Sequence, residues 1–128
     1  MKDKNCAILL PIKPQYANLI LQGIKKYEFR KRLCKKEINT IYIYATAPVK
    51  QVIGEVEVVE KLICDKEQLW QMTKSSSGLS YSEYQNYFCG MDIACAYRLG
   101  GYVLYDVPKS LEDYGINYTV QSFAYIEE

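Results

Sequence analysis

The most informative stretch of this chain is residues 23–30, which read Gly23-Ile24-Lys25-Lys26-Tyr27-Glu28-Phe29-Arg30. From residue 27 to residue 33 the side chains alternate in character, which is typical of a β-strand. Successive side chains of a strand point to opposite faces, so Glu28, Arg30 and Arg32 are predicted to share one face. Lys25 lies in the loop just before this strand.

The charged face of this strand suits an anion. Arg30 and Arg32 offer planar forks of N–H donors that match a phosphate, and Lys25 adds a mobile point charge. Glu28 would orient Arg30 or act as a base. The same spacing also fits an ordinary Glu28–Arg30 ion pair on a solvated face, because such pairs are common and weak. The residues alone leave both interpretations open.

Regular structure is predicted on both sides of this stretch. Pro14 opens a short helix that Gly23 closes, and Asp65, Ser80 and Ser110 resemble helix N-caps. A helical stripe of Tyr81, Tyr84 and Phe88 is predicted to be core. Further strands are expected at residues 6–12, 39–46, 51–62, 93–99, 102–107 and 121–126, with a turn at 100–101. The pattern indicates one α+β domain over residues 1–128, with about six strands curled into a small β-barrel and three or four short helices.

Gly54 interrupts the strand expected over residues 51–62. A glycine inside a strand often marks a bulge or the close approach of another backbone.

The composition of the chain argues against several classes of protein. The 128 residues are 49% hydrophobic, which excludes disorder. No apolar run reaches the roughly 18 residues of a membrane span, and residues 6–12 are too short a run for a signal peptide, so a cytoplasmic location is expected. The five cysteines show no C-x-x-C spacing and are expected to be buried, reduced thiols. We expect no metal and no cofactor.

The absence of histidine removes the usual general base and the Ser-His-Asp arrangement. Charge is uneven: residues 1–49 carry ten basic and three acidic side chains, whereas residues 50–128 carry six basic and twelve acidic ones. This asymmetry favours an anionic partner for one surface.

The motif in residues 23–30 resembles the G-x-K-x-x-E-x-R signature of the ASCH domain, a family of the PUA-like superfamily. Further segments resemble the family in order: residues 12–17, 43–48, 52–54, 114–116 and 121–126. The resemblance therefore spans nearly the whole chain, and the nearest type is a bacterial or archaeal predicted regulator. Relatives often carry prolines where this chain has Thr119 and Val120, which affects the local loop shape.

The resemblance implies a PUA-like β-barrel that binds RNA or a nucleotide. One branch of the family hydrolyses acylated cytidine with a threonine nucleophile three residues after the motif lysine. That position is Glu28 here, so the mechanism is not expected to carry over. Other ASCH-like proteins resemble nucleases.

Several further residues are candidates for nucleic-acid contacts. Lys13 precedes Pro14 and would project toward an anion near the start of the helix, although a plain solvent-facing lysine explains it equally. Tyr44 and Thr46 share a face at the end of a strand, where an aromatic ring beside basic residues suits base stacking. With thirteen tyrosines, core packing is the competing explanation for Tyr44. Ser122 and Gln121 rest on the resemblance alone.

Lys31, Lys35 and Lys36 extend the basic run as either an RNA backbone track or a solvated loop.

Three functions remain open. The first is an RNA- or nucleotide-binding module with a regulatory or RNA-metabolism role. The second is a metal-independent ribonuclease or modified-nucleoside hydrolase, with Lys25, Glu28 and Tyr44 as catalytic candidates. The third is a protein-interaction module that uses the acidic C-terminal part.

Overall fold

The computed structural model describes residues 6–127 of the chain. Its elements follow the order β1 (Cys6–Ile12), α1 (Pro14–Ile20), β2 (Tyr27–Arg30), β3 (Thr40–Ala45), β4 (Gln51–Asp65), α2 (Lys66–Thr73), η1 (Lys74–Ser76), α3 (Tyr81–Tyr87), β5 (Ile93–Lys109), η2 (Leu111–Tyr114) and β6 (Ala124–Glu127). The expected mixture of about six strands and a few short helices is confirmed.

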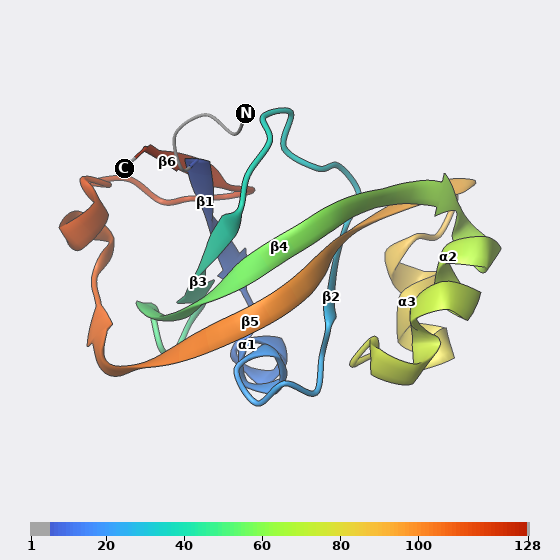
Figure 1. Ribbon diagram of the computed structural model, residues 1–128, viewed down its shortest axis with the longest axis horizontal. Helices are drawn as coiled ribbons and strands as arrows, with labels where there is room; N and C mark the ends of the chain where they lie inside the picture. Colours follow the sequence, from blue (N-terminus) through green and yellow to red (C-terminus); the bar gives the residue numbers. More distant parts are fainter. Residues whose placement is uncertain (1–5, 128) are drawn as a thin grey trace.

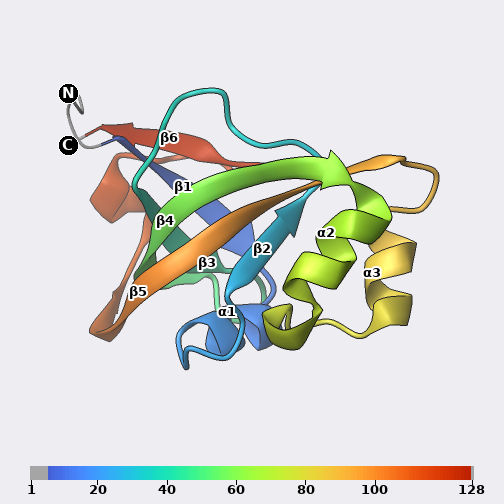
Figure 2. The same cartoon turned by 45° about the vertical axis from the view of Figure 1, so that its right-hand side comes forward.

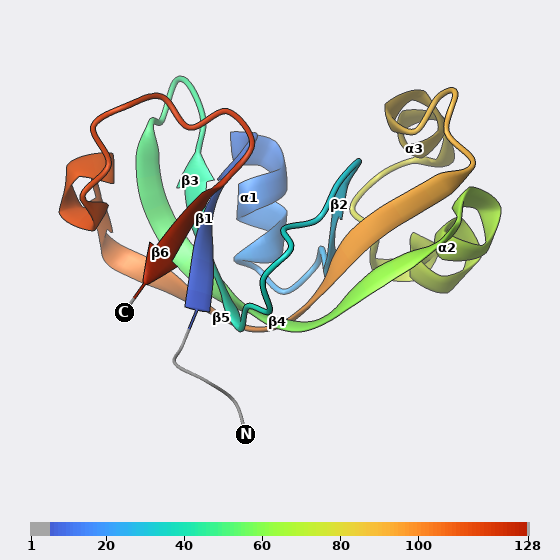
Figure 3. The same cartoon turned by 90° about the horizontal axis from the view of Figure 1, so that it is seen from above.

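All six strands belong to one mixed sheet in the order β2-β5-β4-β3-β1-β6. β1 runs parallel to β3, and every other neighbouring pair is antiparallel. The sheet is open, so the small β-barrel that was expected does not close. The edge strands β2 and β6 have four residues each and lie at different places along the molecule, too short and too far apart to pair with each other (Figure 3).

The two longest strands, β4 and β5, run side by side along the long axis of the molecule (Figure 1). The predicted turn at residues 100–101 does not exist, because β5 continues from Ile93 to Lys109 while staying paired with β4. Register shifts in this pairing, between Val56 and Val58 and again before Glu60, absorb the irregularity that Gly100 and Gly101 introduce. Glycines that signal a turn locally here sit in a bulged strand.

Gly54 is one position where only a glycine fits. A Cβ atom added there would lie 2.5 Å from the backbone oxygen of Val103 and within 3 Å of the Leu21 side chain. The register of β3 with β4 also shifts beside it. Both the bulge and the close approach expected at Gly54 are therefore confirmed.

Buried side chains form three clusters. The first packs α1 against one face of β1, β3 and β4, around Ile8, Leu10 and Ile43. The second joins α2 and α3 to the far ends of β2 and β5. The third lies on the other face of β1, around Leu9 and Val52, under η2 and the segment that leads to β6. Alternate residues of β1 thus serve two cores, which explains its nearly uniform burial.

The second cluster is largely aromatic. Tyr84 packs within 5.0 Å of Phe88 and 4.9 Å of Trp70, measured between ring centroids, and Phe29 of β2 meets Tyr84 edge-on at 5.3 Å. The predicted core stripe is confirmed for Tyr84 and Phe88. Tyr81 packs on Trp70 but is 47% exposed, so it lies at the margin of the core.

The helix N-caps predicted at Asp65, Ser80 and Ser110 are confirmed. Ser80 and Glu83 form a reciprocal capping box at the start of α3, and Ser110 forms another with Asp113 at η2. Asp65 accepts hydrogen bonds from the backbone N–H groups of Glu67 and Gln68 at the start of α2. These caps fix the entry of each helix.

The five cysteines are free, as expected, but not all are buried, because Cys89 is exposed at the end of α3. Within residues 6–127 no helix is long and apolar enough to cross a membrane. The same residues contain no group of three His, Cys, Asp or Glu side chains placed to hold a metal ion.

Candidate functional site

A cavity of about 520 Å³ opens between α1, β2 and α3. Figure 2 shows β2 with α1 on one side and the α2–α3 pair on the other. The lining comes from the end of β1, the motif residues and the segment around α3: Pro11, Ile12, Lys13, Tyr16, Lys25, Glu28, Phe29, Arg30, Leu79, Glu83, Asn86 and Tyr87. The volume falls within the roughly 300–1,000 Å³ of small-molecule sites.

Lys25 lies deep in this cavity and is only 3% exposed. Its Nζ donates a hydrogen bond of 2.6 Å to the backbone oxygen of Ser77 and lies 5.0 Å from the ring centroid of Phe29. Gly78 permits this approach, since an added Cβ would lie 2.8 Å from the Lys25 chain, and its φ of +72° also favours glycine. Lys25 therefore ties the motif to the loop before α3.

Two opposing effects act on the pKa of the Lys25 amine. Burial lowers the pKa of its amine, because the charged form loses hydration, while the carboxylates of Glu28 and Glu83 act in the opposite direction. Burial is the larger of these effects on the pKa of Lys25, and the two carboxylates offset part of it.

Glu28 and Arg30 form the ion pair that one interpretation of the sequence expected. Arg30 Nε lies 3.3 Å from Glu28 Oε2, and Arg30 Nη2 donates to the backbone oxygen of Pro11. Glu28 is 7% exposed. The pair lies in the cavity wall and joins β2 to the end of β1, rather than standing on an open face.

The opposite wall comes from α3. Tyr16 Oη of α1 donates to Glu83 Oε2 at 3.3 Å, across the mouth of the cavity. Hydrogen bonds from Ser80 lower the pKa of Glu83, which keeps its carboxylate ionised, and burial raises the pKa of Tyr16. Beside them, the ring of Tyr87 lies 5.3 Å from Lys31 Nζ.

Lys13, Lys31 and Arg32 are exposed. Lys13 lines the cavity at its rim, and Lys31 reaches it through Tyr87. The predicted strand over residues 27–33 is too long, because β2 ends at Arg30 and the chain bends at Lys31 and Arg32. Arg32 therefore does not continue the strand face that carries Glu28 and Arg30.

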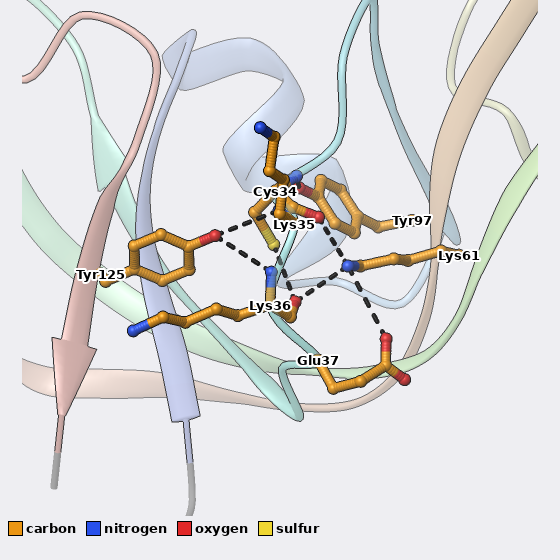
Figure 4. A network of polar contacts seen from close by, with 7 residues as sticks. All are labelled: Cys34, Lys35, Lys36, Glu37, Lys61, Tyr97 and Tyr125. Atoms are coloured by element: carbon orange, nitrogen blue, oxygen red, sulfur yellow. Dashed lines mark hydrogen bonds and ion pairs between the residues drawn. The ribbon is translucent and has the colours of Figure 1, made fainter.

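A network of polar contacts holds the loop that follows this bend (Figure 4). The phenolic oxygen of Tyr97 accepts from the Cys34 backbone N–H at 2.8 Å, and that of Tyr125 accepts from the N–H groups of Lys35 and Lys36 at 3.1 Å. Lys61 Nζ donates to the Cys34 and Lys36 carbonyls. Side chains of β4, β5 and β6 thus hold the loop backbone at residues 34–36, away from the line of β2.

Tyr44, Thr46 and Ser122 do not line the cavity. Tyr44 pairs in register with Pro11 and packs, half-buried, against the third cluster. Ser122 is exposed, two residues before Ala124, which pairs with Leu9 of β1. These predicted residues therefore gather near the end of β1, behind the Pro11 edge of the cavity.

Four cavity residues with polar side-chain atoms were missed by sequence reasoning, namely Tyr16, Glu83, Asn86 and Tyr87. The capping box at Ser80 identified Glu83 only as a helix-start residue. Nothing local indicated that α3 would lie opposite α1.

Comparison with known proteins agrees with this geometry. The family model of the ASCH domain matches residues 10–100. Over 87 residues the chain is 37% identical to an ASCH domain-containing ribonuclease of Zymomonas mobilis, covering 67% of this chain and 59% of that protein. The chain therefore spans less than two-thirds of the length of that relative.

Another relative is larger still. The large ribosomal subunit protein uL22 of Ureaplasma parvum is 26% identical over 121 residues, which are 94% of this chain and 39% of that protein. Among solved structures, the crystal structure of ASCH from Zymomonas mobilis superposes with a TM-score of 0.87 at 28% identity, covering 95% of this chain and 88% of the other. A second structure with a TM-score of 0.87 is a variant of that protein in which a tyrosine is replaced by phenylalanine.

The motif in residues 23–30, the open six-stranded sheet and the family match over most of the chain agree with one another. The chain belongs to the ASCH domain family and has its PUA-like fold.

Proposed function

We propose that this chain acts as one RNA-binding domain in the cytoplasm, and that it takes a base of single-stranded RNA into the cavity between α1, β2 and α3. The observation that carries the proposal is the lining of that cavity, which combines aromatic rings with a few buried polar groups. Such a combination is how proteins recognise unpaired RNA bases, by stacking and by hydrogen bonds to their edges.

The carboxylate acceptors in the lining favour a base with N–H donors over a phosphate inside. Glu28 and Glu83 both face the cavity, and a phosphate placed between two carboxylates would be repelled. Two donors of Arg30 are already engaged by Glu28 and Pro11, and one of the three donors of the Lys25 ammonium is engaged by Ser77. A neutral base carrying N–H groups meets no such penalty.

The phosphates would then follow the rim. Lys13 lies at the rim from the α1 side, and Lys31 and Arg32 follow β2 on the other side. Exposed lysine and arginine side chains suit a polyanion because each contact releases condensed counterions, which makes the affinity salt-dependent.

The test is binding of short single-stranded and duplex RNAs at low and high salt, with a gel to check that the RNA stays intact. Tighter binding of the single strands, weakened by Arg30→Ala and not by Lys109→Ala, is the expected result. Lys109 is a matched control because it lies at the far end of β5, stacked on Tyr105. Equal effects of the two substitutions would refute the assignment of the cavity.

A second candidate function is RNA cleavage, which the printed name of the 37% identical relative favours. In such a reaction the 2′-oxygen attacks phosphorus, a base takes the 2′-hydroxyl proton, and the 5′-oxygen leaves with a proton from an acid. Glu28 would serve as the base, and the Lys25 amine would stabilise the charge on phosphorus or supply the proton. Tyr44 and Ser122 are the alternative hydroxyl-bearing candidates, on the other side of Pro11.

Cleavage is tested by incubating the same RNAs and identifying the ends of the products. A 2′,3′-cyclic phosphate whose appearance requires Lys25 and Glu28 would support this chemistry. Activity that survives Lys25→Ala and Glu28→Ala but falls in Tyr44→Phe or Ser122→Ala would move the reaction to the end of β1.

A further inference from the structure

We propose that the cavity selects guanine, with the Glu28 carboxylate reading the two adjacent N–H donors of its Watson–Crick edge. This inference rests on the proposed RNA-binding function and adds the identity of the base. It begins from hydrogen-bonding capacity, because a site that buries polar groups discriminates by which of them a ligand can satisfy.

The cavity offers ionised acceptors that are oriented but not saturated. Glu28 Oε2 accepts from Arg30 Nε at 3.3 Å, while Oε1 accepts no hydrogen bond from the residues that the structure describes. Glu83 accepts from Ser80 at 2.8 Å and from Tyr16 at 3.3 Å, one bond on each oxygen. An ionised carboxylate has about four acceptor sites and no donor. Glu83 is exposed and can fill its remaining sites from solvent, whereas Glu28 is 7% exposed and is suited to N–H groups supplied by a ligand.

A cationic donor accompanies these acceptors. Lys25 Nζ has three N–H bonds, and Ser77 takes one of them. The rings of Phe29 and Tyr16, at 5.0 and 5.4 Å, flank the ammonium without consuming its strong donor capacity. Two N–H groups of Lys25 thus have no hydrogen bond to the residues that the structure describes, and the Glu28 carboxylate is close enough to oppose the lowering of the pKa of this amine.

Guanine matches this pattern better than the other bases. Its edge carries N1–H and N2–H₂ side by side, which one carboxylate can accept together, and the O6 acceptor next to them suits the ammonium of Lys25. Adenine, cytosine and uracil each place an acceptor nitrogen or oxygen beside their single edge donor, and that acceptor would face a carboxylate. A bidentate pair of this kind discriminates against the wrong base by roughly 1–3 kcal/mol, which is about 5- to 150-fold.

The aromatic residues support the same placement. Tyr16, Phe29 and Tyr87 line the cavity, and a purine offers them the larger face for stacking. Since Glu28 is 7% exposed and Lys25 is 3% exposed, hydrogen bonds to them form largely out of water, where an unmatched group is most costly.

The experiment measures the affinity of five labelled RNA pentamers by fluorescence anisotropy, with a gel to confirm that they stay intact. Their sequences are UUUUU and the same chain with G, A, C or inosine at the centre. Inosine retains N1–H and O6 of guanine and lacks only the N2 amino group. The guanine pentamer is expected to bind about 10- to 100-fold more tightly than UUUUU, and inosine is expected to lose much of that gain.

Glu28→Gln is the first variant, since it keeps the shape of the side chain and replaces one acceptor by a donor. It should reduce the guanine-to-uracil affinity ratio toward one. Glu83→Gln is a second variant that retains a capping side chain at the start of α3, and Glu112→Gln on η2 is the exposed control that should keep the full ratio. Thermal melting of each variant establishes that it folds.

The outcomes separate this inference from the proposed function. Equal binding of all five pentamers, or a ratio that Glu28→Gln leaves unchanged, would overturn guanine selection while RNA binding stands. A preference for adenine or cytosine would overturn it as well. Absence of RNA binding by the wild-type chain would overturn both proposals.

Discussion

Two groups of positively charged side chains in this molecule have opposite surroundings. In the cavity, Lys25 is buried, donates a hydrogen bond to a backbone oxygen and feels the negative charge of Glu28 and Glu83. In the basic loop, defined as residues 31–36, the charged side chains of Lys31, Arg32 and Lys35 are exposed while the backbone is held by Tyr97, Tyr125 and Lys61. Exposed charge in the loop can attract a polyanion at long range. Buried charge in the cavity acts only at short range, on the chemical groups of a ligand that enters the cavity.

The largest effect is expected where the cavity meets the core. Phe29→Ala removes the ring that packs on Tyr84 and Phe88 and that flanks the Lys25 ammonium. The free energy of unfolding should fall by about 3–5 kcal/mol, as measured by urea denaturation. Phe29→Leu should cost less than half as much. A loss below 1 kcal/mol for Phe29→Ala would show that the cavity wall contributes little to the stability of the aromatic core.

The contrast between the buried charge of the cavity and the exposed charge of the basic loop is tested by Lys25→Met and Lys35→Ala. Lys25→Met keeps an unbranched chain and removes the buried donor, so RNA affinity should fall roughly 10-fold, at low and high salt alike. Lys35→Ala should lower affinity only about two- to threefold, and only at low salt, because an exposed charge is screened. The readout is anisotropy at two salt concentrations. If Lys25→Met were rescued by low salt, its ammonium would be acting at long range.

A finer test concerns the slope of affinity with salt. Lys31→Ala and Arg32→Ala should each reduce the slope of log K against log salt by about 0.7, the value for one lost phosphate contact on a single strand. Neither should change the ranking of the bases. A slope that stays constant in both variants would place the RNA backbone elsewhere on the surface.

The smallest effect concerns pH. The pKa of Glu83 is lowered in the folded chain from its ordinary value of 4.5, by hydrogen bonds from Ser80. A lowered carboxyl pKa stabilises the fold above the unfolded value, and that stability is lost as the pH falls through the folded value. Glu83→Gln should therefore lower the melting temperature at pH 7 and have less effect near pH 3. An equal effect at both pH values would show that ionisation of Glu83 is irrelevant.

Local signals predicted much of the fold. Pro14 at the start of α1 and the capping boxes at Ser80 and Ser110 act within one turn of helix, and the structure has each of them. The turn predicted at Gly100 and Gly101 was wrong because pairing with β4, which is distant along the chain, overrides the local preference of glycine for a turn. The open sheet also depends on strand lengths and positions that no local pattern sets.

The candidate site was predictable only on the motif side. Lys13, Lys25, Glu28 and Arg30 lie near one another in the sequence, and the structure brings them to one cavity. The facing wall includes Tyr16 and Glu83, which are far apart along the chain and are joined by a hydrogen bond. The position of α3 opposite α1 follows from the packing of α3 on the aromatic core, and no residue spacing in the sequence predicts it.

The position of β2 at an edge of the sheet bears on how the chain is made. β2 carries the motif, and its strand partner is residues Cys95–Arg98 of β5, which are synthesised much later. Translation supplies only about 5–20 residues per second, so for some seconds the emerging chain presents the charged motif with no strand beside it and no α3 wall. The proposed selection of a base therefore requires β5, and a chain that ends before β5 would offer RNA only the positive charge of the motif.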